Sequence, residues 1–191
     1  MEYIKLYMNS RQLLPPTQVR FPEGYSYRVF QPGDELQWAR IAFEAEQFPS
    51  IPEASAYFHD EFMSHIDRVL QGCFFCCDSN GIPVGTATAW FCTHDGMEQG
   101  MLRWVVVLKK HQGEGLCRPL VGLAVQTLAQ RYERACLYTQ TTSFKGIRVY
   151  LDMGFEPDMQ ADRAQSGWEL VQNQIRHPKL AACLFTCTNK Q

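Results

Sequence analysis

The residues best placed to do chemistry form one short run, Gln112-Gly113-Glu114-Gly115-Leu116-Cys117. An apolar stretch, 102–108, precedes it and an amphipathic stretch, 118–132, follows it. This order predicts a strand that turns through two glycines into a helix, whose first main-chain N–H groups lack partners at the positive end of the helix dipole. Because glycine has no Cβ, a phosphate can approach the main chain closely there. The run therefore predicts a phosphate-binding loop.

Three known kinds of glycine loop do not fit this run. A Walker loop needs Gly-x-x-x-x-Gly-Lys-Ser/Thr, which is absent. A dinucleotide fold needs a third glycine where Arg118 stands, and Glu133, at the place of its ribose-binding acid, falls at the end of the predicted helix. A kinase-type loop lies in a hairpin, whereas a helix follows here. A helix start that uses glycine for its turn and binds nothing remains open.

A second segment extends the pattern. From Val105 onward the chain resembles the GNAT acetyltransferase superfamily, whose loop reads Gln/Arg-x-x-Gly-x-Gly/Ala and opens a helix after a central strand. The family's downstream pattern is Asn-x-x-Ala-x-x-x-Tyr-x-x-x-Gly-Phe. Its last three residues are matched here by Tyr150, Gly154 and Phe155. The close resemblance covers roughly residues 101–157.

The chain departs from the family pattern at a few positions. Cys117 replaces a small Gly or Ala, and cysteine is small enough for the turn to survive. Ser143 replaces an asparagine that usually touches the cofactor arm, so a weaker contact is expected there. Gly146 replaces an alanine, and Lys109 stands where many members have proline.

The resemblance implies acetyl-CoA, or a related acyl-CoA, as the donor. Main-chain N–H groups of the loop would bind the pyrophosphate, and Arg118 would add a charge-assisted contact, although a solvated Arg118 is an equal alternative. The pantetheine arm would pair with the strand 101–108 like an extra strand. The residues expected to hold the donor are Val105, Val106, Val107, Gln112, Gly113, Glu114, Gly115, Leu116, Cys117, Arg118 and Ser143. No metal is expected.

The resemblance also implies a general acid and leaves the base open. Tyr150 is the expected acid, because a phenol beside the leaving thiolate can donate its proton; a tyrosine that only packs on the sheet is the alternative. Glu98 is the nearest candidate base, with His94 and Asp95 in the same loop, and a surface role is the competing interpretation for each.

The predicted function is N-acetyltransfer from acetyl-CoA to a primary amine, on a small molecule or a peptide. A non-catalytic acyl-CoA-binding sensor or scaffold is the alternative, and a structural domain that binds nothing is a second. The acceptor would meet the two early helices, whose acids and aromatic rings would suit a cationic amine, although ordinary helix faces explain them as well. These residues are Phe43, Glu44, Glu46, Phe48, Tyr57, Phe58, Asp60, Glu61 and Phe62.

The expected fold is α/β (α+β), a GNAT-type mixed and mostly antiparallel central sheet with helices on both faces. Residues 1–24 are expected to be an N-terminal extension, and 25–191 a single GNAT-like acyltransferase domain. The Asn80-Gly81 pair predicts a tight hairpin turn, and Asp34 is expected to cap the first helix, which runs through about residue 48. A second helix is expected over 53–70 and a last strand over 181–188.

Composition limits the class of protein. The chain has 191 residues, of which 46% are hydrophobic and 13% aromatic, as in a folded globular protein. The net charge of −2 gives no support to a nucleic-acid partner. No apolar run reaches the length of a membrane span, and no signal peptide is recognised, so a cytoplasmic protein is expected. A homodimer is left open.

The eight cysteines are expected to be free thiols used as small core residues. Cys73-x-x-Cys76 and Cys183-x-x-x-Cys187 have the spacing of zinc half-sites. A strand over 73–77 argues against zinc at the first pair, because Cys73 and Cys76 would then point to opposite faces.

Overall fold

The computed structural model describes residues 1–188 and confirms the expected mixed α/β architecture, with seven strands in the order β2-β3-β4-β5-β6-β1-β7. The strands are β1 (Lys5–Ser10), β2 (Ser26–Val29), β3 (Cys73–Cys77), β4 (Pro83–His94), β5 (Met97–Val107), β6 (Ala135–Gln140) and β7 (Glu156–Pro157). The helices are α1 (Glu35–Glu44), α2 (Ile51–Phe62), α3 (Ile66–Gly72), α4 (Cys117–Arg131), α5 (Phe144–Asp152), α6 (Ala164–Ile175) and α7 (Pro178–Thr188).

The chain divides into two compact units. The first unit comprises Met1–Pro15, Phe91–Met101 and the chain from Leu128 onward; the second comprises Pro16–Trp90 and Leu102–Thr127. Strands β4 and β5 and helix α4 each contribute residues to both units. Within the described residues, no helix combines the length and the apolar character that a membrane span requires.

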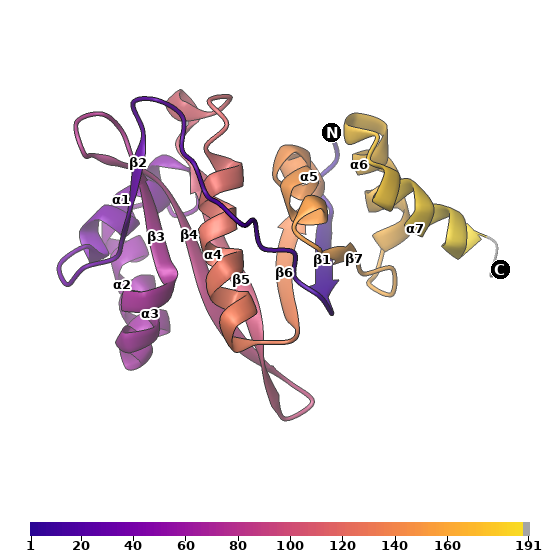
Figure 1. The fold of residues 1–191 in the computed structure, drawn as a ribbon, viewed down its shortest axis with the longest axis horizontal. Coiled ribbons are helices and arrows are strands. Elements are labelled where there is room, and N and C mark those ends of the chain that lie inside the picture. Colours follow the sequence, from indigo (N-terminus) through magenta and orange to yellow (C-terminus); the bar gives the residue numbers. More distant parts are fainter. Residues whose placement is uncertain (189–191) are drawn as a thin grey trace. The chain divides into compact units, whose positions relative to one another are not determined.

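The second unit is built on the hairpin that the sequence predicts. β2, β3 and β4 pair antiparallel, and Gly81 in the turn between β3 and β4 has a φ of 77°, which suits the predicted Asn-Gly turn. Every residue of β3 is buried. Helices α1, α2 and α3 lie together beside β2 and β3 (Figure 1). Their shared core is aromatic and contains Phe30, Trp38, Phe58, Phe62 and Phe75.

Three helix predictions in this unit need correction. The first helix, expected to run through about residue 48, ends at Glu44. Asp34 occupies the N-cap of α1, but its carboxylate does not cap the helix. It accepts hydrogen bonds from Arg28 at 2.8 Å and from the N–H of Gln31 at 2.7 Å instead. The predicted helix over 53–70 is two helices, α2 and α3, with a single 3-10 turn at Met63–His65 between them.

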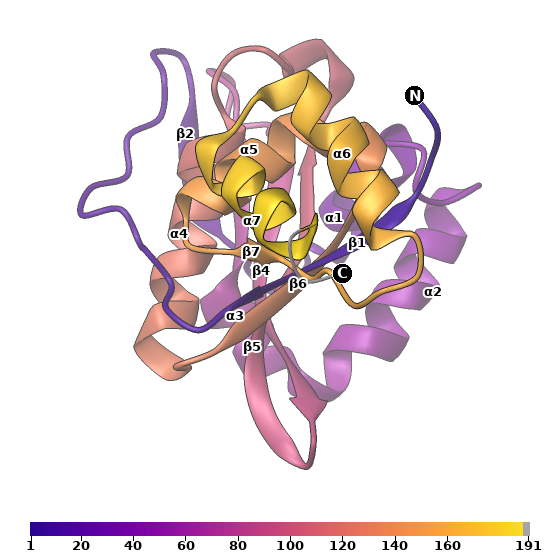
Figure 2. The same cartoon turned by 90° about the vertical axis from the view of Figure 1, so that its right-hand side faces the viewer.

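The first unit contains a strand that the sequence analysis did not predict. β1 lies between β6 and β7 and pairs antiparallel with both. Leu6 and Met8 of β1 are buried, as is Ile4 directly before the strand, and a Cβ at Gly167 of α6 would lie 2.8 Å from Leu6. Figure 2 shows α6 and α7 beside β1.

The predicted last strand over 181–188 is wrong, because these residues belong to helix α7. Pro178 stands at its start, where its missing N–H costs nothing. Leu180 is fully buried, and Cys183, Leu184 and Cys187 are partly buried at helical spacing, whereas Phe185 is exposed.

The segment from residue 16 to residue 25 follows helix α4 within the second unit (Figures 1 and 2). Gln126 of α4 donates a hydrogen bond to the carbonyl of Pro16 at 2.7 Å. A Cβ at Gly122 of α4 would lie 2.9 Å from Pro16 and 3.4 Å from Val19, so glycine allows this close approach. The segment is therefore packed on the helix that follows the glycine run.

Candidate functional site

The glycine run forms the open turn that the sequence predicts, directly before α4. Gly113 has a φ of 95° and Gly115 a φ of 79°, a region that residues with side chains rarely adopt. A Cβ at Gly113 would meet nothing within 4 Å, and at Gly115 it would meet only Pro22, at 4.0 Å. The main chain of this turn is therefore accessible to a ligand, as a phosphate cradle requires.

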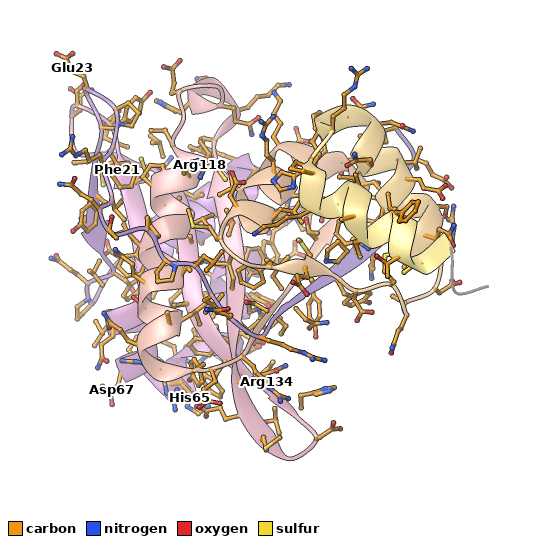
Figure 3. All side chains as sticks on the ribbon, turned by 45° about the vertical axis from the view of Figure 1, so that its right-hand side comes forward. Phe21, Glu23, His65, Asp67, Arg118 and Arg134 are labelled. Atoms are coloured by element: carbon orange, nitrogen blue, oxygen red, sulfur yellow. The ribbon has the colours of Figure 1, made fainter. Side chains whose placement is uncertain are left out.

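The first turn of α4 supplies the donors for such a ligand. The helix begins at Cys117, so its early N–H groups have no carbonyl partner within the helix. Pro119 follows in the same turn and carries no N–H, which confines the available donors to the residues up to Arg118. Leu116 is buried and holds the turn to the core, whereas Arg118 is exposed at the start of the helix (Figure 3).

Cys117 does not contribute a reactive group to this turn. Burial raises the pKa of its thiol to about 11, against the lowering effect of the Arg118 charge. At neutral pH the side chain is therefore a neutral thiol, which is compatible with an anionic ligand.

The loop is tied to the strand before it. The side-chain amide of Gln112 donates to the carbonyl of Val107 at 2.9 Å. A single 3-10 turn, η2 (Lys109–His111), connects the strand to Gln112, and the N–H of Leu108 donates to Val84 of β4 at 2.9 Å. These bonds fix the place of the loop at the end of β5.

Along the three valines Val105, Val106 and Val107, strand β5 has one edge that faces β4 and one edge that faces away from it. Leu108 bonds toward β4, and the carbonyl of Val106 also faces β4, because a Cβ at Gly85 would lie 2.8 Å from it. Strand residues alternate, so the main-chain groups of Val105 and Val107 face the opposite edge. All three valines are only half-buried. This edge is suited to an extended ligand that pairs with the strand.

Trp104, immediately before the valines, has a φ of 54° within β5. Such a residue marks an irregularity that redirects a strand. Its ring lies 4.7 Å from Trp38, 5.6 Å from Phe48 and 5.3 Å from Tyr57. Trp104 is not among the residues predicted from the sequence, since tryptophan carries no local signal for a positive φ.

The expected acid lies in the first unit. Tyr150 of α5 is 7% exposed, and its ring is 6.5 Å from that of Phe155. A Cβ at Gly146 would lie 3.3 Å from the Tyr150 hydroxyl oxygen, so the glycine that replaces the family's alanine leaves room for the phenol. Ser143 directly precedes α5 and accepts a hydrogen bond from Gln140 at 2.8 Å.

The expected base, Glu98, also belongs to the first unit. It lies near the start of β5, in an exposed hairpin, and accepts a hydrogen bond from the Tyr132 hydroxyl at 2.8 Å. Its neighbours His94 and Asp95 are exposed. The structure thus places Val105–Val107 and the loop in the second unit, and Tyr150, Ser143 and Glu98 in the first.

The acidic and aromatic residues expected near an acceptor are partly used within the protein. Glu61 forms an ion pair with Arg103, which also donates to the Tyr57 hydroxyl at 2.7 Å. Glu44 pairs with Arg40 at 2.8 Å. A surface cavity of about 610 Å³ lies at the end of α1, lined by Phe43, Glu44, Glu46, Gln47, Phe48 and Pro49. This cavity brings Glu44 and Glu46 together with two of the expected rings.

The eight cysteines are free thiols. Cys73 is the first and Cys76 the fourth residue of the buried β3, three positions apart and therefore on opposite faces.

Comparison with known proteins identifies the family. A family model described as "Acetyltransferase (GNAT) family" matches residues 36–155. Mycothiol acetyltransferase of Streptomyces bingchenggensis is 30% identical over an alignment of 155 residues, and the match covers 76% of this chain and 49% of that protein. The chain therefore spans about half the length of the curated relatives that it matches.

Solved structures share the fold. A GCN5-related N-acetyltransferase from Sphaerobacter thermophilus has a TM-score of 0.61 and 22% identity, over 81% of this chain and 48% of that one. A GNAT-family acetyltransferase from Colwellia psychrerythraea has a TM-score of 0.58 and 11% identity, over 82% of this chain and 54% of that one. At sequence identities of 22% and 11%, the similarity to these structures is a similarity of fold.

Proposed function

Because the chain belongs to the acetyltransferase (GNAT) family, we propose that it transfers an acetyl group from acetyl-CoA to a primary amine by direct attack. The observation that carries this proposal is the open glycine turn between the end of strand β5 and helix α4. Both glycines have positive φ, and added Cβ atoms would meet almost nothing, so the turn is shaped for a ligand that approaches the main chain.

The loop and the strand would hold the donor in two different ways. Main-chain N–H groups from Gly113 to Arg118 would bind the pyrophosphate, with the positive end of the α4 dipole behind them. The outward main-chain groups of Val105 and Val107 would pair with the extended arm of the donor. The bound donor supplies a thioester, whose carbonyl carbon an amine can attack.

Three groups of the chain would assist the transfer. A main-chain N–H of the valine edge would donate to the thioester oxygen as negative charge develops there. The Tyr150 hydroxyl would keep its proton until the sulfur leaves, and would then give it to the thiolate. Glu98 is the proposed acceptor of the amine proton, directly or through water. In the complete transfer, one C–N bond forms and one C–S bond breaks.

We propose only the chemical class of the acceptor, which is a primary amine, and no individual compound. The match covers less than half of the relatives named for mycothiol, 49% of one and 43% of another, so their acceptor is not transferred to this chain. The cavity at the end of α1 contains carboxylates and rings, which suits a cationic amine.

The first experiment is calorimetric titration of the purified protein with acetyl-CoA, alongside Gly115→Trp and Gly81→Trp. Both glycines have φ values near 80°, but Gly81 lies in the β3–β4 turn and outside the glycine run, and a Cβ there would meet nothing within 4 Å, so this variant carries the same backbone strain without filling the loop. Micromolar binding that only Gly115→Trp loses is the expected result. No binding to the wild-type protein would refute the proposal.

A second assay separates the enzyme from the acyl-CoA sensor. The release of free coenzyme A is followed with a panel of polyamines, aminoglycosides, amino acids and peptides. Turnover with any amine supports the transferase. Tight donor binding without turnover on any of these classes would favour the sensor or scaffold.

A further inference from the structure

The segment over residues 16–25 reaches both sides of the candidate donor loop. On the helix side, it packs on α4 at Gly122 and Gln126. Farther along, Pro22 is the one neighbour within 4 Å of an added Cβ at Gly115. Figure 3 labels Phe21 on this segment and Arg118 on the first turn of α4. The segment thus passes the loop rather than ending before it.

The far end of the segment is held by Tyr25. Its hydroxyl and Nδ1 of His111 share a hydrogen bond of 3.0 Å, and the two rings meet edge to face at 5.8 Å and 89°. The N–H of Tyr25 donates to the carbonyl of Pro22 at 3.1 Å, which connects this contact to the residue beside Gly115. His111 is the last residue of η2 and directly precedes Gln112. The glycine turn is therefore flanked by contacts of one short segment on both sides.

The surroundings of Tyr25 keep its hydroxyl protonated, and the histidine tautomer decides which partner donates in the bond to His111. Desolvation raises the pKa of its phenol, and the negative charge of Glu114 raises it further. The phenol therefore stays protonated across the neutral range. The effect of Glu114 also places a charge of the loop itself within electrostatic reach of the Tyr25 hydroxyl.

We propose that Tyr25 is a positioning residue for the donor loop: its bond to His111 fixes η2, and thereby the glycine turn, in the conformation that binds the pyrophosphate of coenzyme A. This inference rests on the proposed function for its ligand. Tyr25 acts through His111 and Gln112 and needs no contact with the donor. The segment 16–25 is then a preorganising strap along α4.

The size of the effect follows from the bond that is lost. A neutral hydrogen bond contributes roughly 1 kcal/mol, so its removal lowers the ratio of anchored to released loop by about five-fold. The apparent affinity falls with the fraction of protein that has the competent loop. Coenzyme A binding should therefore weaken by at most about five-fold, with about two-fold as the lower value that supports the proposal.

The test compares Tyr25→Phe with Tyr27→Phe. Tyr27 is two residues farther along, on β2, and is 49% exposed. Its ring stacks on Phe21 at 5.7 Å, and phenylalanine keeps that contact. Both variants thus lose one hydroxyl from the same region, and only one of these hydroxyls reaches η2. His111→Phe and the double variant complete a mutant cycle.

Three readouts are taken. Amide hydrogen exchange over residues 109–118 is measured in the ligand-free protein. Coenzyme A affinity is measured by calorimetry, and kcat and KM for acetyl-CoA are measured with the best acceptor. The expected result is faster loop exchange, weaker binding and a higher KM with unchanged kcat in Tyr25→Phe and His111→Phe alike. The double variant should show no further loss, and Tyr27→Phe should match the wild type.

Two other outcomes overturn the proposal. If Tyr25→Phe lowers only the unfolding temperature and leaves loop exchange and affinity unchanged, the bond supports the fold and does not position the loop. If the effects of Tyr25→Phe and His111→Phe add in full, the two residues do not act through their shared bond. Failure of the wild-type protein to bind coenzyme A would refute the proposed function and the named ligand, while the ligand-free exchange still decides whether Tyr25 fixes the loop.

Discussion

Replacement of Gly154 by alanine should destabilise the protein strongly, because the glycine serves two purposes at once. Its φ is 92°, where a residue with a Cβ loses roughly 1–2 kcal/mol. A Cβ there would also lie 2.5 Å from the carbonyl oxygen of Gln12 and 3.1 Å from the N–H nitrogen of Leu14. The N–H of Leu14 donates a hydrogen bond to the carbonyl of Met153 at 2.9 Å. A shift of Leu14 away from the new Cβ would weaken this bond, which contributes roughly 1 kcal/mol.

These costs sum to about 4 kcal/mol once roughly 1–2 kcal/mol is allowed for overpacking. For a chain of this size, such a loss lowers the unfolding temperature by about 8–16 °C. Urea titration followed by circular dichroism measures the change in free energy of unfolding directly.

Gly96→Ala is the matched control in the same unit. Gly96 has a φ of 76°, and a Cβ there would meet nothing within 4 Å, so only the conformational cost of roughly 1–2 kcal/mol applies. Gly154→Ala should therefore exceed Gly96→Ala by about 2 kcal/mol. Equal losses in the two variants would show that the contact with residues 12–14 is unimportant and would refute the reasoning.

Three further predictions concern catalysis, acid stability and thiol reactivity. Tyr150→Phe should lower kcat by roughly 10²-fold or more with little change in the donor KM, since general acid catalysis contributes about that factor. An unchanged kcat would show that Tyr150 only packs on the sheet. Burial raises the pKa of Asp34, but hydrogen bonds from Arg28 and the Gln31 N–H outweigh it and leave the pKa below its ordinary value. Asp34 therefore stabilises the fold fully above about pH 4, its unfolded pKa, and this contribution is lost as pH falls through the lower folded pKa. Asp34→Asn should lower the free energy of unfolding by roughly 1.5–3 kcal/mol at pH 7. In urea unfolding measured from pH 2 to 7, the midpoint of the variant should fall less on acidification than that of the wild type, and an identical fall would contradict the assignment. Burial raises the pKa of Cys73 to about 11 and of Cys76 and Cys136 to about 12, so at pH 8 roughly one in 10³ of these thiols or fewer is ionised. Iodoacetamide should label them slowly in the native protein and readily in urea, and mass spectrometry that found rapid native labelling would reveal local opening instead.

Features that depend on neighbouring residues could be predicted from the sequence. The glycine run was recognised because positive φ, which the structure gives to Gly113 and Gly115, is a property of single residues. The Asn80-Gly81 turn was recognised for the same reason. The strand before the glycine run and the helix after it followed from apolar periodicity, and the family's two motifs together indicated the fold that the comparisons confirm.

Two errors came from short apolar runs that have no unique local interpretation. Apolar residues alternate at Ile4, Leu6 and Met8, but one of the residues between them is Tyr7, and the signal is weak without the partner strand β6. The run 181–188 has the apolar spacing of a helix, yet its eight residues fit a strand in composition. In both cases burial against distant elements decides the conformation.

The remaining features were decided by tertiary structure alone. Trp104 adopts a positive φ between rings from α1 and α2, and a local rule would assign that conformation to glycine. Tyr25 and His111 are 86 positions apart, and Ile4 and Thr141 are 137 apart. The sequence by itself determined where the chain turns at its glycines and which loop we propose as the phosphate site. Which residues support that loop depends on contacts between distant segments, because their energies arise only after the chain has closed and no local pattern encodes them.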